Sequence, residues 1–412
     1  MKYGLIGEKL THSFSKELHT KLGNYEYEIC EIKKNELSTF MQKKDFRAIN
    51  VTIPYKESVI PHLHYISDEA RAIGAVNTVV NRDGLLYGYN TDFFGMSALI
   101  ERTGISISGK KAVILGSGGT AKTASAVLSY LGAGSILTVS REKKENTITY
   151  DELYSEHNDT EIIINTTPVG MYPNNLSSPI EISNFPKLCG VIDAIYNPLR
   201  TKLVLMAKER GIKADGGLYM LVAQGVRASE IFHDVKYNEY TTEKIYREIL
   251  AEKENIVLIG MPSSGKSTVG KIIAKKLSKN FCDTDTLVEK STNNTISEIF
   301  EYYGEKHFRE LEKKEIANVS LQNQAVISTG GGVILNKENI DILKQNGKIF
   351  YIDRSPELLY PTPDRPLAQN KEALKKLYKE RYDLYSDAAD IRVSGDADPH
   401  EVAEEIIGGF YI

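Results

Sequence analysis

Two glycine-rich loops, each between an apolar strand and a helix, constrain the fold of this chain most strongly. The first loop spans residues 116–121 and fits G-x-G-x-x-A, and the second spans residues 260–267 and fits G-x-x-x-x-G-K-S. Glycine lets a backbone approach an anion closely, and the N-terminus of the following helix offers N–H groups to phosphate. The loops lie far apart in a chain of 412 residues, so we predict at least two α/β units that each bind a phosphorylated ligand.

Composition narrows the classes of protein that remain. Hydrophobic residues make up 41% and charged residues 26%, the balance of a globular protein, and the net charge of -4 with scattered Lys and Arg gives no reason to expect a nucleic-acid partner. The cysteines Cys30, Cys189 and Cys282 are too far apart for a disulfide framework or a zinc site. No leader peptide and no apolar run of about 20 residues is visible. We therefore expect a cytoplasmic protein with no membrane partner.

The pattern of apolar residues divides the chain into three regions. Strands at residues 3–7 and 25–32, a helix at 16–22, and a hairpin of 76–80 with 85–89 around Asp83-Gly84 indicate a first α/β region at 1–100. A βαβ pattern starting at residue 112 indicates a Rossmann domain at 101–225, with 226–250 packing back on the first region. A stiff helical stretch at 241–255 then leads to a third domain at 255–412.

The loop of the third domain predicts a nucleotide site. Backbone N–H groups would surround the β-phosphate, Lys266 would neutralise β and γ oxygens, and Ser267 would ligate Mg²⁺. A glycine-rich turn that binds no nucleotide is the alternative. The residues expected to contact ATP are Gly260, Met261, Pro262, Ser263, Ser264, Gly265, Lys266, Ser267 and Thr268.

Residues after this loop indicate the phosphoryl acceptor. Asp283 and Asp285 follow the next strand at i, i+2, and would point the same way if the strand continued, so that one serves the metal and one the acceptor. Arg309, the triple glycine at 330–332 and the Asp-Arg-Pro-Leu run at 364–367 come next. With these motifs in this order, residues 255–412 resemble the shikimate kinases, which have a P-loop fold with a parallel sheet and a lid.

This resemblance assigns roles to individual residues. It implies that Asp283 holds Mg²⁺ through water, that Asp285 is the catalytic base, and that Arg309 and Arg381 grip the shikimate carboxylate with their bidentate guanidinium groups. A solvated helix position is the alternative for either arginine taken alone.

The same resemblance describes the loop and lid around the acceptor. It implies that the backbone around Gly331 allows the substrate ring to approach closely and that the lid arginine Arg365 meets the transferring phosphoryl group. The segment before Arg365 is shorter than usual and lacks the family's adenine-covering arginine at residues 357–364, where Tyr360 could stack instead.

Several N-terminal motifs together indicate a second active site. Ser13 and Ser15 follow the first strand and could bind a carboxylate, although capping of the next helix is the alternative. Motifs at residues 50–56, 73–78 and 88–92 follow in order at strand edges. Together they resemble the substrate domain of the shikimate dehydrogenases.

The dehydrogenase resemblance implies that Lys56 and Asp92 form the catalytic pair and that Thr52, Asn77 and the two serines contact substrate. Reduction of a ketone leaves an alkoxide that needs a proton, and a cation such as Lys56 can both stabilise and protonate it. Taken alone, Lys56 could be an exposed helix-start lysine and Asp92 an N-cap.

The first glycine loop and the segments after it complete this resemblance over residues 1–250. A guanidinium about twenty residues beyond the loop, at Arg141, favours the 2′-phosphate of NADP over NAD. By the resemblance, Tyr196 and Gln224 reach substrate while Gly217 and Met220 border the nicotinamide, although Met220 and Leu221 could equally be core. The remaining residues expected to bind NADP(H) are Gly116, Ser117, Gly118, Gly119, Thr120, Ala121, Ser140 and Lys144.

The two motif sets imply consecutive reactions, the reduction of 3-dehydroshikimate with NADPH and the phosphorylation of shikimate with ATP and Mg²⁺, in a monomer or homodimer. One alternative is a dehydrogenase for quinate or NAD fused to a kinase for another small acceptor. Another is a ligand-sensing regulator without turnover, which the presence of Lys56, Asp92, Lys266 and Asp285 argues against.

Overall fold

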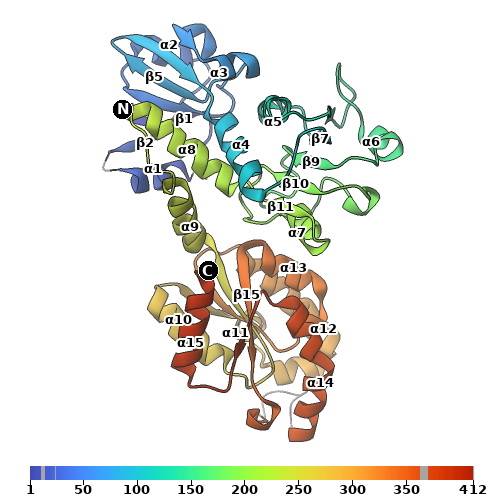
Figure 1. Ribbon diagram of the computed structural model, residues 1–412. Helices are drawn as coiled ribbons and strands as arrows, with labels where there is room; N and C mark the ends of the chain where they lie inside the picture. The colour runs from blue at the N-terminus through green and yellow to red at the C-terminus, as the bar shows by residue number, and fades with distance from the viewer. Residues whose placement is uncertain (11–13, 24, 362–369, 412) are drawn as a thin grey trace. The chain divides into compact units, whose positions relative to one another are not determined.

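A computed structural model describes residues 1–10, 14–23, 25–361 and 370–411 and divides into two compact units, Met1–Ile249 and Leu250–Ile412 (Figure 1). The boundary falls inside helix α9 (Thr241–Lys253), so the units are joined by helical chain. No helix in the described part of the chain is both long and apolar enough to cross a membrane.

Unit 1 begins with a six-stranded mixed sheet in the order β2-β1-β3-β5-β6-β4. Its strands are β1 (Tyr3–Gly7), β2 (Tyr27–Glu31), β3 (Ala48–Val51), β4 (Tyr65–Ile66), β5 (Thr78–Arg82) and β6 (Leu85–Tyr89). The predicted hairpin is confirmed, because β5 and β6 pair antiparallel around Asp83 (φ 51°) and Gly84 (φ 82°), both left-handed as such a turn requires.

Helices cover this sheet and deliver side chains to its edge. They are α1 (Ser15–Leu22), α2 (Leu37–Lys43), α3 (Asp68–Ile73) and the 3₁₀ turn η1 (Ile60–His62). Helix α1 has Phe14 at its N-cap and no side-chain cap there. Helix α4 (Thr91–Thr103) is capped by Asn90, whose Oδ1 accepts from the Phe93 N–H at 3.2 Å, so Asp92 lies in the first turn and is not the N-cap.

A second sheet of unit 1 is entirely parallel, in the order β11-β10-β9-β7-β8. Its strands are β7 (Lys111–Leu115), β8 (Ser135–Val139), β9 (Ile162–Asn165), β10 (Gly190–Asp193) and β11 (Lys213–Asp215), with helices α5 (Gly119–Tyr130), α6 (Tyr150–Glu156) and α7 (Lys202–Glu209). Ala112 and Ile114 pack with α4 and α5, whereas Val113 and Leu115 pack with α6 and α7. Burial on both faces explains the continuous apolar run of β7.

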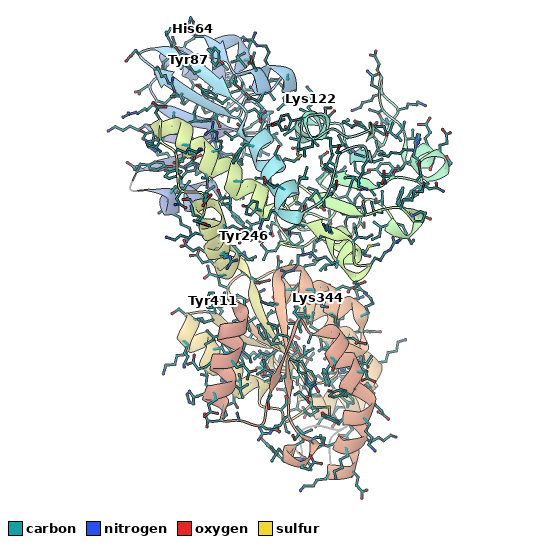
Figure 2. All side chains as sticks on the ribbon, viewed as in Figure 1. His64, Tyr87, Lys122, Tyr246, Lys344 and Tyr411 are labelled. Carbon is teal, nitrogen blue, oxygen red and sulfur yellow. The ribbon has the colours of Figure 1, made fainter. Side chains whose placement is uncertain are left out.

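Helix α8 (Leu218–His233) packs along α4 (Figure 1). The two backbones approach so closely that a Cβ at Gly95 would lie 2.6 Å from the Met220 carbonyl oxygen. Arg102 of α4 then ties α9 to this pair, because its guanidinium lies 4.5 Å from the ring of Tyr246 (Figure 2) and pairs with Glu243 at 3.2 Å.

Unit 2 is a three-layer α/β fold around a parallel sheet in the order β13-β14-β12-β15-β16. Its strands are β12 (Asn255–Ile259), β13 (Asn280–Asp283), β14 (Ala325–Ser328), β15 (Gly347–Asp353) and β16 (Ile391–Ser394). Side chains of β12 alternate between the faces: Ile256 and Leu258 pack with α10 (Lys266–Leu277) and α15 (Pro399–Phe410). Val257 and Ile259 pack on the face covered by α12 (Ile296–Ser320), α13 (Lys337–Asn346) and α14 (Lys371–Ala388).

One local expectation is wrong. Strand β13 ends at Asp283, and α11 (Thr284–Thr292) starts at the next residue with Asp283 as its N-cap. The carboxylate of Asp283 accepts from the Thr286 N–H at 3.3 Å, a local hydrogen bond that favours the turn into helix over a longer strand. Asp283 and Asp285 are therefore not alternate residues of one strand.

A buried histidine connects α1 to the first sheet. His19 is 1% exposed, stacks on Tyr27 with ring centroids 3.9 Å apart, and shares a hydrogen bond between Nδ1 and the Tyr25 hydroxyl at 2.5 Å. Burial lowers the pKa of His19 to about 3, although a side-chain hydrogen bond with Asn50 opposes the shift. Because Asn50 lies on β3 at the substrate edge, this contact links a core histidine to the candidate site.

The lowered pKa of His19 predicts an acid-sensitive unit 1. The unfolded chain protonates this ring near pH 6.5, but the folded chain does so only near 3, so the unfolded state binds more protons and stability falls as pH falls below 6.5. Each pH unit of acidification in this window costs about 1.4 kcal/mol. His19→Asn should flatten the slope measured by denaturant titration between pH 6.5 and 4.5. An unchanged slope in His19→Asn would contradict the assignment.

Candidate active sites

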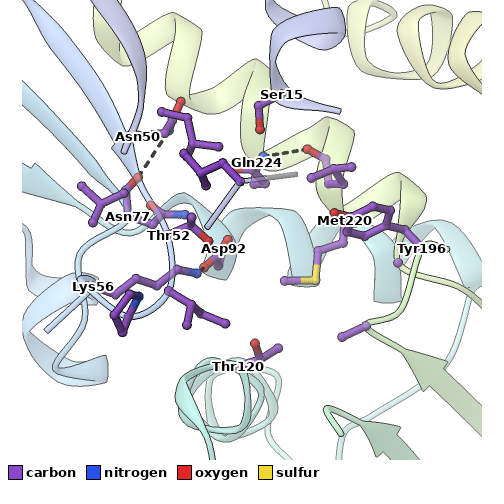
Figure 3. Close-up of a pocket in the computed structure, with 18 of the residues that line it drawn as sticks. Ser15, Asn50, Thr52, Lys56, Asn77, Asp92, Thr120, Tyr196, Met220 and Gln224 are labelled. Atoms are coloured by element: carbon purple, nitrogen blue, oxygen red, sulfur yellow. Dashed lines mark hydrogen bonds and ion pairs between the residues drawn. The ribbon is translucent and has the colours of Figure 1, made fainter. Parts of the chain in front are cut away.

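An ion pair marks the site of unit 1 (Figure 3). Lys56 lies in the turn after β3 and Asp92 in the first turn of α4, and Lys56 Nζ donates to Asp92 Oδ2 at 2.6 Å. The side chains are 24% and 16% exposed, so the pair is partly shielded but reachable. The carboxylate fixes the direction of the ammonium group, which is what a positioned proton donor requires.

The ion pair faces a cavity of about 680 Å³, a volume suited to a small polar molecule and part of a cofactor. Many residues singled out from the sequence line it, from the first sheet, α4, the first glycine loop and α8. These are Ser15, Thr52, Lys56, Asn77, Asp92, Thr120, Tyr196, Gly217, Met220 and Gln224. Met220 is 8% exposed, lines the cavity and also belongs to the core between α4 and α5, and its contact with a nicotinamide stays a prediction. Ser13 lies outside the described residues.

Hydrogen bonds fix the orientation of Asn77. Its Oδ1 accepts from the Thr91 N–H at 2.8 Å and from the Thr78 hydroxyl at 3.1 Å, so its amide nitrogen is the atom suited to donate to a ligand. The Thr91 hydroxyl lies 3.3 Å from Gln224 Oε1. Sequence reasoning missed Thr91, which connects the two predicted substrate residues, although it stands within the Asn90-Thr91-Asp92 motif.

Asn50 is a second cavity residue that the sequence analysis assigned no role. It is 7% exposed, accepts from the Tyr27 hydroxyl at 2.8 Å and donates to Thr78 Oγ1 at 3.1 Å. Its signal was its place in the motif at residues 50–56, directly before Thr52.

The first glycine loop is shaped for phosphate. It joins β7 to α5. In the sheet, β8 lies on one side of β7 and β9 lies on the other side, and at such a switch point an α/β sheet opens a crevice. Gly116 has φ +105°, and a Cβ there would lie 2.8 Å from Thr166 Oγ1. Helix α5 has Gly118 as its N-cap with no side-chain cap, and a Cβ at Gly118 or Gly119 would meet nothing within 4 Å. The N–H groups at this helix end are open to an anion.

The residues proposed for the far end of the cofactor lie around the end of β8. Ser140 is 6% exposed, and its hydroxyl donates to the Glu142 carbonyl and pairs with Thr147 at 2.9 Å, so it stabilises the turn. Arg141 is exposed, and Lys144 Nζ donates to Ser117 Oγ at 3.1 Å. Lys144 therefore places a cation at the loop, and Arg141 is an exposed cation just after β8.

The second glycine loop encloses its lysine. Gly260 (φ +150°) and Gly265 (φ +93°) bend the chain, and a Cβ at Gly260 would lie 2.6 Å from the Ile352 carbonyl oxygen. Lys266 is 6% exposed, and its Nζ donates to the carbonyl oxygens of Gly260 at 2.9 Å and Met261 at 2.8 Å. The ammonium group thus lies within the curve of the loop. The remaining loop residues are Pro262, Ser263 (φ 65°) and Ser264, followed by Ser267 and Thr268 in α10.

Oxygen atoms suited to Mg²⁺ gather beside this loop. Ser267 Oγ donates to Asp283 Oδ2 at 2.7 Å and lies 3.2 Å from Ser328 Oγ. Among the described residues no three His, Cys, Asp or Glu side chains cluster to form a complete metal site. The hydroxyl and carboxylate fit Mg²⁺, which prefers few protein oxygens completed by water and phosphate.

Side chains press closely on the triple glycine at residues 330–332. A Cβ at Gly330 would lie 2.5 Å from Asp285 Oδ1, and a Cβ at Gly332 would lie 2.2 Å from a terminal nitrogen of Arg309. At Gly331 it would lie 2.9 Å from Pro262 Cδ. Glycine is needed here because side chains from three other segments press on the backbone.

Two arginines lie against the triple glycine, and a glutamate that the sequence reasoning missed holds one of them, Arg309. Arg309 pairs with Glu312 at 2.9 Å and with Glu305 at 2.9 Å, and Arg381 donates to the Gly331 carbonyl at 2.8 Å. Glu312 is 1% exposed; burial raises its pKa, and the charge of Arg309 opposes that shift. Its signal was the i, i+3 spacing from Arg309 on one helix face. Arg365 lies outside the described residues, and the Tyr360 ring is 57% exposed.

Comparisons with known proteins assign both units. Residues 5–79 match the family model described as "Shikimate dehydrogenase substrate binding domain", and residues 262–409 match "Shikimate kinase". A shikimate dehydrogenase (NADP(+)) of Clostridium perfringens is 42% identical over 265 residues, which cover 60% of this chain and 97% of that protein.

Solved structures agree with the assignment of unit 1. Shikimate dehydrogenase 1 of Peptoclostridium difficile is 38% identical with a TM-score of 0.55, covering 60% of this chain and 98% of its own. The Thermus thermophilus enzyme, solved in complex with NADP(H) and shikimate, is 27% identical with a TM-score of 0.54, covering 60% and 99%. The chain belongs to the shikimate dehydrogenase family and carries a shikimate kinase domain at its C-terminal end.

Gly332→Ala tests the crowding around the triple glycine of unit 2. The added methyl group cannot coexist with Arg309 in its present position, so we expect the KM for the phosphoryl acceptor to rise at least tenfold. ATP affinity should change less than twofold, because the P-loop is untouched. Gly408→Ala, where a Cβ meets nothing within 4 Å, is the matched control. Equal KM values for both variants would show that Arg309 does not depend on this glycine.

Proposed function

We propose that unit 1 reduces 3-dehydroshikimate to shikimate with NADPH and that unit 2 phosphorylates shikimate with ATP and Mg²⁺. The observation that carries the proposal is the Lys56–Asp92 pair at 2.6 Å, facing a cavity that the cofactor loop and Asn77 also reach. Within this proposal residues 1–100 with 226–250 hold substrate, 101–225 hold NADP(H), and 255–412 form the kinase.

The chain's own residues divide the work of the reduction. Bound NADPH supplies the hydride. Lys56 stabilises the developing alkoxide and donates the proton, while Asp92 keeps its ammonium group aimed at that oxygen. Asn77 donates to a ring hydroxyl through its amide nitrogen, because its Oδ1 already accepts hydrogen bonds from the protein. Gln224 contacts the substrate beside it and is held there by its hydrogen bond with Thr91. Ser15, Thr52 and Tyr196 complete the substrate contacts.

Phosphoryl transfer relies on positioned charge in unit 2. Bound ATP supplies the phosphoryl group. Lys266 exchanges its contacts with two loop carbonyls for phosphate oxygens, and Ser267 with Asp283 holds Mg²⁺. Asp285 accepts the proton of the acceptor hydroxyl, and Arg309 with Arg381 binds the carboxylate.

Two sets of residues support the proposed cofactor and the proposed cellular compartment. NADP(+) stands in the names of the similar dehydrogenases, and the exposed Arg141 with Lys144 offers positive charge for a 2′-phosphate. The cysteines Cys30, Cys189 and Cys282 are all unpaired, which suits a reducing cytoplasm. The proposed ligands are small molecules, for a monomer or homodimer.

Single substitutions should separate the two activities. Lys56→Ala removes the proton donor and should lower ketone reduction at least a hundredfold while phosphorylation of added shikimate persists. Lys266→Ala should do the reverse, because the lysine neutralises transferring phosphate. NADPH oxidation and ADP release report the two reactions. Loss of both activities in one folded variant would contradict two independent sites.

Arg141→Asp should reverse the charge that faces the 2′-phosphate. We expect the KM for NADPH to rise at least tenfold while that for NADH changes little, because a charge-assisted hydrogen bond is worth about 1.5–3 kcal/mol. Arg141→Lys, which keeps the charge, should retain most of the preference for NADPH. The proposal for Arg141 fails if the NADPH/NADH ratio of kcat/KM is the same in all three proteins.

A further inference from the structure

Arg354 stands at the mouth of the second glycine loop. It is the first residue after β15, the strand that runs beside β12 with Tyr351 opposite Ile259. A terminal nitrogen of Arg354 lies 3.9 Å from the position of a Cβ at Gly265, the N-cap of α10. The guanidinium group therefore sits at the helix end that the P-loop offers to phosphate.

The bonding state of this arginine is unusual for unit 2. Its Nε is buried and has no hydrogen-bond partner among the described residues. The other described arginines of unit 2 are engaged: Arg309 with two glutamates, Arg381 with the Gly331 carbonyl and Arg392 with Asp353. An unsatisfied buried N–H is costly, so such a group in a native protein calls for an explanation.

Asp396 is the acidic residue near Arg354, but its carboxylate already accepts hydrogen bonds from another residue. Its carboxylate accepts from the Ser355 N–H at 2.8 Å and from the Ser355 hydroxyl, and it forms no ion pair with Arg354 among the described contacts. These hydrogen bonds lower the pKa of Asp396, with a smaller effect from the charge of Arg354. The carboxylate thus fixes the loop that carries Arg354 without neutralising its guanidinium group.

The local backbone holds Arg354 in place. Asp353 pairs with Ser394 across β15 and β16, and a Cβ at Gly395 would lie 3.1 Å from Arg354 Cβ. The arginine is therefore packed at its base between two strand ends while its guanidinium group reaches Gly265. A second polar atom nearby, the hydroxyl of Ser264, is also buried without a partner among the described residues.

We propose that Arg354 binds the phosphates of the nucleotide held by the P-loop. Lys266, the uncapped N-terminus of α10 and Arg354 then place three sources of positive charge around one anion. The position also gives unit 2 a nucleotide-binding arginine on a rigid strand end, where residues 357–364 of the lid segment contain none. This inference rests on the proposed kinase function and adds one residue to its nucleotide site.

The test measures binding of ATP and of inorganic tripolyphosphate to the full chain by titration calorimetry with Mg²⁺ present. Arg354→Gln should raise both dissociation constants at least tenfold, because a charge-assisted contact to phosphate is lost. Arg354→Lys keeps the charge and should weaken both about threefold. Lys376→Gln removes the same charge from a side chain that is 79% exposed and should change neither.

Each outcome decides the assignment. Unchanged binding of both ligands in Arg354→Gln overturns it, and weaker binding of ATP with normal binding of tripolyphosphate moves the contact to the adenosine and overturns the phosphate role. Far-UV circular dichroism and thermal unfolding of the full chain serve as the folding control, and if Arg354→Gln does not fold, unchanged affinities in Arg354→Lys overturn the proposal instead. Failure of the wild-type chain to phosphorylate shikimate while it binds ATP would count against the kinase function and not against Arg354.

Discussion

Both units depend on the same constraint. In each, a helix follows a buried parallel strand and has a glycine at the position where a capping side chain usually stands. Helices α6, α7, α12 and α14 begin with Thr149, Thr201, Thr295 and Asn370, and each cap accepts a backbone N–H. Helices α5 and α10 begin instead with Gly118 and Gly265 and have no side-chain cap. Their first N–H groups remain for a phosphate, and an anion that binds there satisfies them.

Near each of these helix ends, contacts with neighbouring residues fix the positions of charged side chains before any ligand binds. In unit 1 the Lys56–Asp92 pair joins two elements of the substrate region, and Thr91 fixes Asn77 next to it. In unit 2 Glu312 holds Arg309 at the triple glycine. Such preorganisation means that binding and reaction need little rearrangement of these groups, which is where enzymes gain most from electrostatics.

The sequence was informative where a motif is local. The strand-loop-helix order of both glycine loops, the Asp83-Gly84 hairpin and the approximate ends of β7 and β12 follow from apolar periodicity and turn chemistry. It was misleading at Asp283, because capping of α11 competes with strand extension, and periodicity does not report that competition. Asn50 and Arg354 could not be assigned, since their roles come from contacts with segments distant in the sequence, whereas Glu312 was missed although it stands only three residues from Arg309 on the same helix.

The most direct measurement follows both chemistries in one reaction with the wild-type chain. The chain is given 3-dehydroshikimate, NADPH, ATP and Mg²⁺, and NADPH oxidation and shikimate 3-phosphate are measured together. The account predicts one phosphorylated product for each NADPH oxidised, accumulation of shikimate when ATP is left out, and no phosphorylated product when NADPH is left out. NADPH oxidation that never yields shikimate 3-phosphate, or phosphorylated product formed without NADPH, would contradict two consecutive activities in one chain.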